Sequence, residues 1–134
     1  AHHPTEIRAT LQAARALLGC GGRLYCVFQS HTYSRTAAFF AEFCVALRLA
    51  DRVIVTDIYP ARETDTLGMS GALLAAGVGD GAAYAGSFHA VAELLRQELS
   101  PLDMVVVMGA GDVNRLFAGF GERGFTSGAE SDKI

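Results

Sequence analysis

The sequence is nearly free of lysine, because its basic residues are ten arginines and the single Lys133. A phosphate-binding P-loop requires a lysine directly after its second glycine. No lysine stands in such a position. The chain is therefore not a self-contained P-loop ATPase, and an ATP-driven reaction that used it would need a phosphate site elsewhere.

Long apolar runs and a strong charge of one sign are also missing. No apolar run reaches the roughly 18 residues that a membrane helix needs, and no basic stretch followed by an apolar one opens the chain. The net charge is −3, with acidic and basic residues interspersed, which argues against a surface that follows nucleic-acid phosphates. We expect a cytoplasmic, soluble protein that binds neither nucleic acid nor membrane.

Cysteine is scarce and lacks the spacing of a metal or redox site. The three cysteines are odd in number and form no CxxC pair. Cys26 lies in a strand-like run and Cys44 in a helix-like one, where free cysteine usually behaves as a small buried hydrophobe. Structural thiols are expected, and no metal site is predicted.

Helical and strand patterns alternate along the 134 residues, about half of which are apolar. Helices are expected at 4–18, 35–49, 70–76, 87–99 and 113–120, and strands at 24–28, 53–55, 82–84 and 104–108. This order predicts an α/β, Rossmann-like fold, with a mostly parallel sheet and helices on both faces. Residues 1–120 form the expected domain, and the glycine- and charge-rich 121–134 a flexible tail.

Parallel sheets bind ligands beyond the carboxyl ends of their strands. That rule selects residues 29–36, 57–69 and 109–114, where the polar and unusual residues of the chain also concentrate. These three segments are the candidate functional regions.

The 29–36 segment joins a buried strand to a helix start. Backbone N–H groups and the helix dipole favour an anion there, and Arg35 offers a forked contact to a carboxylate or phosphate. His31 and Tyr33 lie beside it. The alternative is that Ser34 caps the helix while Tyr33 packs and Arg35 is solvated. The residues alone favour neither interpretation.

The loop that begins at Asp57 offers Tyr59, Arg62 and Glu63 as further donors and acceptors, which suit an amino acid or a ribose. The alternative is a solvated loop in which Arg62 and Glu63 pair weakly. Exposed charged loops are common, so the residue chemistry by itself favours the alternative.

The third segment, with Gly109, Gly111 and Asp112, begins like a dinucleotide fingerprint but lacks its third glycine and a suitably spaced acidic residue. An NAD site is therefore disfavoured, and a tight strand-to-helix turn is the simpler interpretation. His2 and His3 allow either the remnant of a purification tag or two ligands or proton carriers at a domain entrance.

Four motifs together resemble the C-terminal domain of the Mur ligases, in particular the members that add L-alanine. They are His2-His3-Pro4-Thr5-Glu6, the stretch from Phe28 to Thr36, the loop from Asp57 to Glu63, and Gly109-Ala110-Gly111-Asp112. The resemblance runs in order from residue 2 to about 118, and it argues against a tag remnant. Ser30 replaces the family's usual proline and Thr32 a common arginine, so only Arg35 of two arginines is kept.

The resemblance implies an ATP-dependent ligase that joins L-alanine to UDP-N-acetylmuramate through an acyl phosphate, in peptidoglycan precursor synthesis. ATP and Mg²⁺ would be bound mainly by a central domain and the sugar nucleotide by an N-terminal one. This domain would close over the site as a lid and be inactive alone. The implied catalytic residue is His3, the substrate-binding residues are His31, Tyr33, Arg35, Tyr59, Arg62 and Glu63, and the nucleotide-binding residues are Asp57, Gly109, Gly111 and Asp112.

Two other functions stay open at this point. One is a tripeptide-recycling ligase of the same type, which shares His-His-Pro but usually differs in the segment equivalent to 28–36. The other is a non-catalytic α/β module that binds a nucleotide or a flavin, because residues 29–36 partly resemble a flavin phosphate loop.

Overall fold

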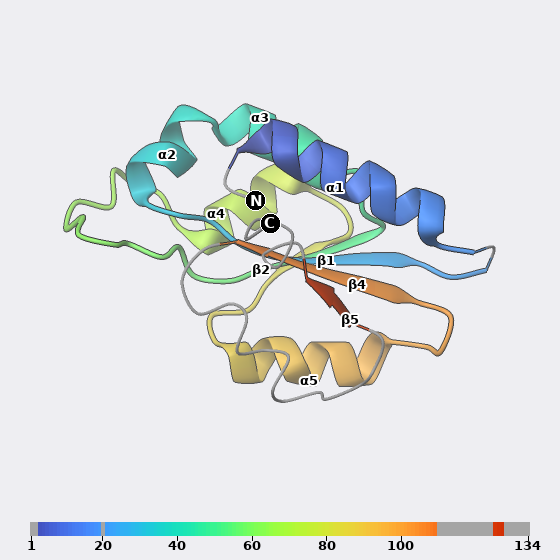
Figure 1. Ribbon diagram of the computed structural model, residues 1–134. Helices are drawn as coiled ribbons and strands as arrows, with labels where there is room; N and C mark the ends of the chain where they lie inside the picture. The colour runs from blue at the N-terminus through green and yellow to red at the C-terminus, as the bar shows by residue number, and fades with distance from the viewer. Residues whose placement is uncertain (1–2, 20, 110–124, 128–134) are drawn as a thin grey trace.

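The computed structural model describes residues 3–19, 21–109 and 125–127 (Figure 1). In chain order the elements are α1 (Pro4–Leu17), β1 (Leu24–Gln29), α2 (Tyr33–Ala38), α3 (Phe40–Leu47), β2 (Arg52–Val55), α4 (Gly71–Val78), β3 (Ala82–Tyr84), α5 (Phe88–Glu98), β4 (Met104–Gly109) and β5 (Phe125–Ser127). No helix among these residues is long and apolar enough to cross a membrane.

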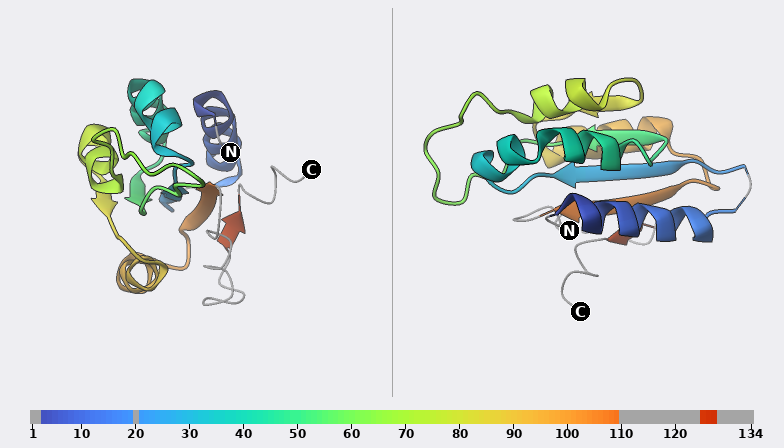
Figure 2. Two further views of the ribbon diagram at one scale, coloured as in Figure 1. Left: turned by 90° about the vertical axis from the view of Figure 1, so that its left-hand side faces the viewer. Right: turned by 90° about the horizontal axis from the view of Figure 1, so that it is seen from above.

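The five strands form one sheet in the order β3-β2-β1-β4-β5, and every pair of neighbours is parallel. Figures 1 and 2 show α1, α3 and α4 over one face of the sheet and α5 over the other. The predicted Rossmann-like α/β fold is therefore confirmed. The strand order reverses between β1 and β4, which is the topological switch point where such sheets bind ligands.

Alternate residues of the strands supply two separate cores. Cys26 and Phe28 of β1 pack with α1, α3 and α4, whereas Tyr25 and Val27 pack with α5. This alternation follows from the period of two along a strand. Burial raises the pKa of the Cys26 thiol and Cys44 is buried as well, so the expected structural role of these two thiols is confirmed.

The first helix begins as its sequence predicts. His3 is its N-cap, Pro4 occupies the first helical position, and Glu6 completes a capping box by accepting a hydrogen bond from the His3 backbone N–H. Such caps satisfy N–H groups that a helix start leaves without partners. The buried stripe comprises Pro4, Ile7, Leu11 and Ala14.

The single helix expected over 35–49 is wrong in two respects. It begins at Tyr33, because the Thr32 hydroxyl caps the helix by accepting from the Arg35 N–H at 3.2 Å. It is also divided at Phe39, whose backbone (φ −115°, ψ 24°) leaves the helical range. The Phe39 ring packs 5.2 Å from the His3 ring and 6.5 Å from that of Phe43, and these contacts accompany the break.

Three residues of the segment 121–134, which was expected to be a flexible tail, lie in a strand. Phe125–Ser127 form β5, which pairs with β4 through Val105 to Val107. A three-residue strand shows too little alternation to be detected in a glycine-rich segment. The sequence of its partner β4 does not reveal that a further strand pairs with it. The helix predicted over 113–120 lies outside the described residues.

Charged side chains at the amino ends of the strands pair with one another. Arg52 donates both hydrogen bonds of a fork to Glu98, each at 2.9 Å, and Arg15 pairs with Asp51 at 2.8 Å. The Arg23 guanidinium lies 5.0 Å above the Tyr25 ring. This amino edge is thus internally neutralised.

Candidate functional site

The carboxyl ends of β1 and β2 continue beyond the sheet as an irregular pair. Phe28 lies opposite Val55, and three residues later His31 lies opposite Tyr59. Between these pairs β1 has two residues and the β2 side has three, which is a bulge of one residue. The pair is held by hydrogen bonds from the Tyr59 N–H to the Ser30 carbonyl at 2.8 Å and from the Thr32 N–H to the Tyr59 carbonyl at 2.7 Å.

The bulge decides which side chain stands beside His31. With regular pairing Ile58 would lie opposite His31, but the extra residue brings Tyr59 there instead. The two rings stack with centroids 5.8 Å apart, while Ile58 is buried. A β-bulge beside a site commonly re-aims a side chain in this way.

Glu63 occupies the start of α2. Its carboxylate accepts from the backbone N–H of Tyr33 at 2.5 Å and of Ser34 at 3.1 Å, and also from the Ser34 hydroxyl. The hydroxyl bond has the largest effect on the pKa of Glu63 and, with the backbone bonds, lowers it against the opposing effect of desolvation. The anion that the helix start favours is thus supplied by the protein itself.

Two of these contacts differ from those expected if the segments had no functional role. Glu63 bonds to α2, thirty residues away, rather than to Arg62, and the helix cap is Thr32 rather than Ser34. The cap holds Thr32 at φ 62°, ψ 149°, a region that non-glycine residues rarely occupy and that carries about 1–3 kcal/mol of strain. Strain of this kind is often found beside functional sites.

Arg35 and Arg62 both project from this region as exposed side chains. Among the described residues neither guanidinium has an ion-pair partner, in contrast to the paired arginines of the amino edge. Two uncommitted cations beside a strand end suit an anionic ligand group.

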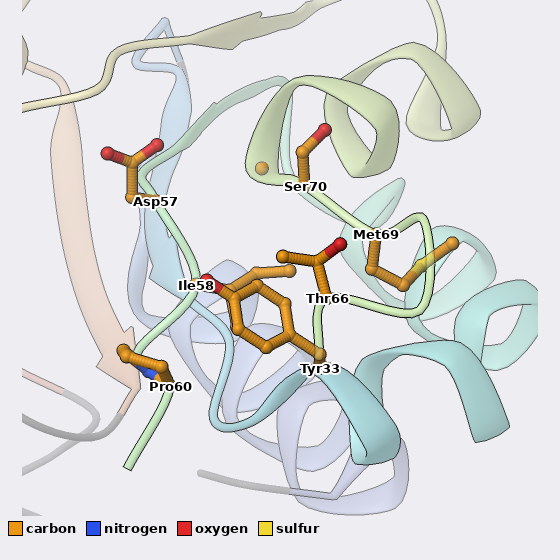
Figure 3. A pocket seen from close by; sticks show the side chains of 8 residues that line it. Tyr33, Asp57, Ile58, Pro60, Thr66, Met69 and Ser70 are labelled. Carbon is orange, nitrogen blue, oxygen red and sulfur yellow. The ribbon is translucent and has the colours of Figure 1, made fainter. Parts of the chain in front are cut away.

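A pocket of about 400 Å³ lies behind the start of α2 (Figure 3). Figure 3 shows the Tyr33 ring between Pro60 and Thr66, with Ile58 behind it and Ser70 at the start of α4. The Asp57 carboxylate lies at its far side and accepts a hydrogen bond from the Tyr84 hydroxyl, which raises the pKa of Tyr84. The pocket places hydroxyl and carboxylate groups next to an aromatic ring.

Gln29 lies at the switch point, where β1 meets β4. Its side chain is only 8% exposed, and its Nε2 donates to the Asp57 carbonyl at 3.4 Å. Its Oε1 is buried and has no hydrogen-bond partner among the described residues. Opposite it stands Gly109 (φ 142°), where an added Cβ would lie 2.3 Å from the Gln29 carbonyl oxygen, so only glycine fits.

His3 lies on a different element from these residues. As the N-cap of α1 it accepts from the Thr5 N–H at Nδ1, 3.1 Å away, and its ring contacts Phe39 at the end of α2. His3 is exposed, and the contact with Phe39 links it to the helix that carries Arg35. Its predicted place beside a reacting centre stays a prediction.

The structure therefore brings most of the predicted residues together. His31, Tyr33, Tyr59 and Glu63 are joined by hydrogen bonds, ring stacking or pairing, and Asp57 lies next to them. Gly111 and Asp112 lie outside the described residues. Sequence reasoning assigned no role to Gln29 or Tyr84. The strand-end rule could have found Tyr84, because it ends the predicted strand over 82–84 at the same edge.

No group of three or more His, Cys, Asp or Glu side chains in the described part of the chain is placed to hold a metal ion. The described residues thus do not fit a magnesium site of their own.

The parallel sheet, its switch point and the polar groups at its carboxyl edge define a Rossmann-like module, and sheets of this kind generally bind their ligands beyond the strand ends. A family model described as "Mur ligase, glutamate ligase domain" matches residues 1–111. The chain belongs to this family.

The chain is similar to UDP-N-acetylmuramate–L-alanine ligases. It is 54% identical over 118 residues to the protein of that name from Mycobacterium tuberculosis strain H37Rv and 52% identical over 118 residues to that from Mycobacterium ulcerans strain Agy99. Each match covers 87% of this chain and 24% of the relative. The chain thus spans about a quarter of the length of the curated relatives that it matches.

A crystal structure has the same fold. It is a domain assigned to a UDP-N-acetylmuramate:L-alanyl-γ-D-glutamyl-meso-diaminopimelate ligase from Haemophilus ducreyi, and it superposes with a TM-score of 0.59 at 24% identity. The superposition covers 89% of this chain and 81% of that domain. At this identity the likeness concerns the fold alone.

Proposed function

We propose that this chain is the C-terminal, amino-acid-binding domain of an ATP-dependent ligase that joins L-alanine to UDP-N-acetylmuramate in peptidoglycan precursor synthesis. The observation that carries the proposal is the 54% identity with L-alanine ligases over 118 residues. The strand-end residues that carried the family resemblance gather at one edge of the sheet, which supports a shared site.

The reaction has two steps. The carboxylate of UDP-N-acetylmuramate takes the γ-phosphoryl group of ATP, which gives an acyl phosphate and ADP. The amine nitrogen of L-alanine then forms a bond to the acyl carbon. The bond from that carbon to the phosphate oxygen breaks, phosphate leaves with its electron pair, and the amine proton passes to phosphate or water.

In this proposal ATP and Mg²⁺ are bound mainly by another domain, since this chain has no P-loop lysine. The sugar nucleotide is also held elsewhere. This domain contributes residues that close over the acyl phosphate and exclude water, which would otherwise hydrolyse it.

Arg35 and His31 are proposed to bind the carboxylate of L-alanine or the acyl phosphate. Arg35 is exposed and has no ion-pair partner among the described residues, so its guanidinium can form a charge-assisted contact without losing an internal one. His31 is held against Tyr59, which fixes the plane of its ring. Fixed donors reduce the entropy lost when the ligand binds.

Tyr59 and Arg62 are proposed to line the part of the site that binds the amino acid or the nucleotide. Asp57 and Tyr33 border the pocket of about 400 Å³. Asp57 is proposed to face the ribose of ATP, and Tyr33 is proposed to contact the substrate. Gly109, with the predicted Gly111 and Asp112, is proposed to complete the nucleotide side. His3 is proposed to lie beside the reacting centre.

Glu63 is proposed to act as a positioning residue, rather than as a direct ligand of the substrate. Its two carboxylate oxygens already accept from Tyr33 and Ser34. These bonds tie the 57–63 loop to the start of α2 and thereby hold Arg35 and His31 on one side of the site.

The test is ligation by the complete protein that carries this chain. ADP release should depend on both L-alanine and UDP-N-acetylmuramate, and mass spectrometry should detect the mass of the L-alanyl product. Turnover only with a tripeptide in place of L-alanine would instead support a recycling ligase. Flavin absorbance in the purified protein together with no turnover would contradict the ligase proposal.

A further inference from the structure

We infer that Gln29 binds the amino group of the incoming amino acid, with its side-chain oxygen accepting an N–H of the nucleophilic amine. This inference rests on the proposed function and adds a subsite to it. It starts from a buried acceptor, Gln29 Oε1, that has no partner among the described residues.

The orientation of the Gln29 amide is determined by its neighbour. The Asp57 backbone carbonyl can only accept a hydrogen bond, so the Nε2 of Gln29 must face it, as it does at 3.4 Å. Reversing the amide would bring two acceptor oxygens together. The atom left for a ligand is therefore Oε1, which requires a ligand that donates an N–H or O–H.

The location of Gln29 also points to a ligand. A buried polar atom without a partner is uncommon, because it forfeits the hydrogen bonds that water would provide. This one lies at the switch point between β1 and β4, where sheets of this kind bind their ligands. Opposite Gln29, β4 ends at Gly109, whose lack of a Cβ lets the backbones of β1 and β4 lie close together at this point.

The spacing to His31 matches an α-amino acid. Tyr25 and Val27 face α5, so alternation places Gln29 on that side, while the Ser30 hydroxyl bonds to Thr36 on the opposite side. The pairing of His31 with Tyr59 keeps the chain extended. His31 then follows Gln29 on the α5 side at a distance of about 6.6 Å along the strand. That interval lets one ligand place its carboxylate at His31 and its amine at Gln29.

The neutral amide also suits the chemistry of the amine. An amine attacks an acyl phosphate only in its unprotonated form, with a free lone pair. A carboxylate at position 29 would favour the ammonium ion by Coulombic attraction, whereas an amide oxygen accepts one N–H without holding the extra proton. Gln29 is thus expected to orient the amine while leaving its lone pair available.

Two substitutions in the complete protein test this role. Gln29→Met keeps the length of the side chain and removes the acceptor, and we expect the KM for L-alanine to rise at least about tenfold, the effect of losing one such hydrogen bond. The KM values for ATP and UDP-N-acetylmuramate should stay within about twofold.

Gln29→Glu keeps an acceptor but adds a negative charge. The kcat at neutral pH should fall and the kcat–pH profile should move to higher pH, because the bound amine is held as ammonium. The matched controls are Gln97→Met and Gln97→Glu on the exposed side of α5, which should change none of these values.

The outcomes separate this inference from the proposed function. A wild-type protein that does not ligate L-alanine contradicts the proposed function. The Gln29 inference is overturned if the wild type ligates L-alanine but Gln29→Met changes all three KM values equally, or changes only the urea midpoint. In either case Oε1 would bind water or protein. If Gln29→Met does not fold, an unchanged pH profile in Gln29→Glu overturns the inference by itself.

Discussion

The two edges of the sheet use their charged side chains in opposite ways. At the amino edge Arg52 pairs with Glu98 and Arg15 with Asp51, so these charges satisfy one another. At the carboxyl edge Arg35 and Arg62 have no ion-pair partner in the described part of the chain. The arginines at the carboxyl edge could therefore contact an anionic ligand without losing an ion pair, whereas those at the amino edge could not.

The edges also differ in backbone strain. Thr32 and Ala61, both near the carboxyl edge, have positive φ values of 62° and 56°, which non-glycine residues seldom adopt. The strands themselves have regular parallel registers. Strain in the loops around a site is tolerated where the geometry serves binding. The difference between the two edges predicts that substitutions at the carboxyl edge will affect activity and that those at the amino edge will affect stability.

The largest effect is expected from Arg35→Ala. Loss of a charge-assisted contact to the ligand should lower kcat/KM for L-alanine by about a hundredfold, while the urea unfolding midpoint stays unchanged because Arg35 has no described ion pair to lose. Steady-state kinetics and urea denaturation of the complete protein measure both. Arg96→Ala is the control, since its exposed pair with Glu93 contributes little. Unaltered kinetics in a folded Arg35→Ala variant would remove Arg35 from the site.

A smaller effect is expected from Glu63→Gln. The amide keeps one acceptor but loses the charge that the start of α2 favours, so kcat/KM should fall by up to about tenfold. Because the folded state lowers the pKa of Glu63, its stabilising contribution is present above the ordinary carboxyl pKa and is lost as the pH falls through the lowered value. The wild type should therefore lose more stability than Glu63→Gln at acidic pH. Equal acid sensitivity of the two proteins would contradict the capping role.

At the amino edge, Arg52→Met should change stability and leave activity unaltered. The Arg52 and Glu98 side chains are each about one-quarter exposed. Loss of their ion pair should lower the free energy of unfolding by roughly 1 kcal/mol. The shift in urea midpoint at a constant m-value measures the loss. A change in the KM for L-alanine would show that the two edges are coupled, and would contradict a purely structural role of the amino edge.

The smallest effect concerns Asp51. The side-chain hydrogen bond from Arg15 is the main cause that lowers the pKa of Asp51 below 3.8, and the Leu24 N–H adds to it, against a smaller effect of burial. Its contribution is thus complete above about pH 5 and is lost as the pH falls through the lowered value. Since the pair is over one-third exposed, solvent screening keeps this contribution under about 1 kcal/mol. Unfolding of Asp51→Asn should show a flatter pH dependence below pH 4, and an equally steep one would contradict it.

The fold could be predicted from local sequence because its signals are local. Met104–Gly109 is a strand of consecutive apolar residues with β-branched valines at its centre, and the α1 stripe repeats with helical spacing. Ser70 and Ser87 cap their helices as expected. The break at Phe39 was missed, because it coincides with ring contacts to side chains on another helix.

The location of the candidate site could be predicted from the sequence, but the contacts within the site could not. The strand-end rule located His31 and Asp57 from sequence, since it needs only the order of elements. The bonds from Tyr33 and Ser34 to Glu63 join residues about thirty positions apart, and no local pattern contains them. Gln29 was passed over for the same reason: its burial depends on how β1, β2 and β4 meet.

The bulge before Tyr59 makes this edge of the molecule sensitive to chain length rather than to side-chain identity. Removing one residue between Val55 and Tyr59 would leave two residues between the pairs on each side, so the bulge would be lost and Tyr59 would still stand opposite His31 in regular pairing. A single insertion at 56–58 would either enlarge the bulge or bring Ile58 opposite His31 in place of Tyr59, so insertions there should be more damaging than single deletions.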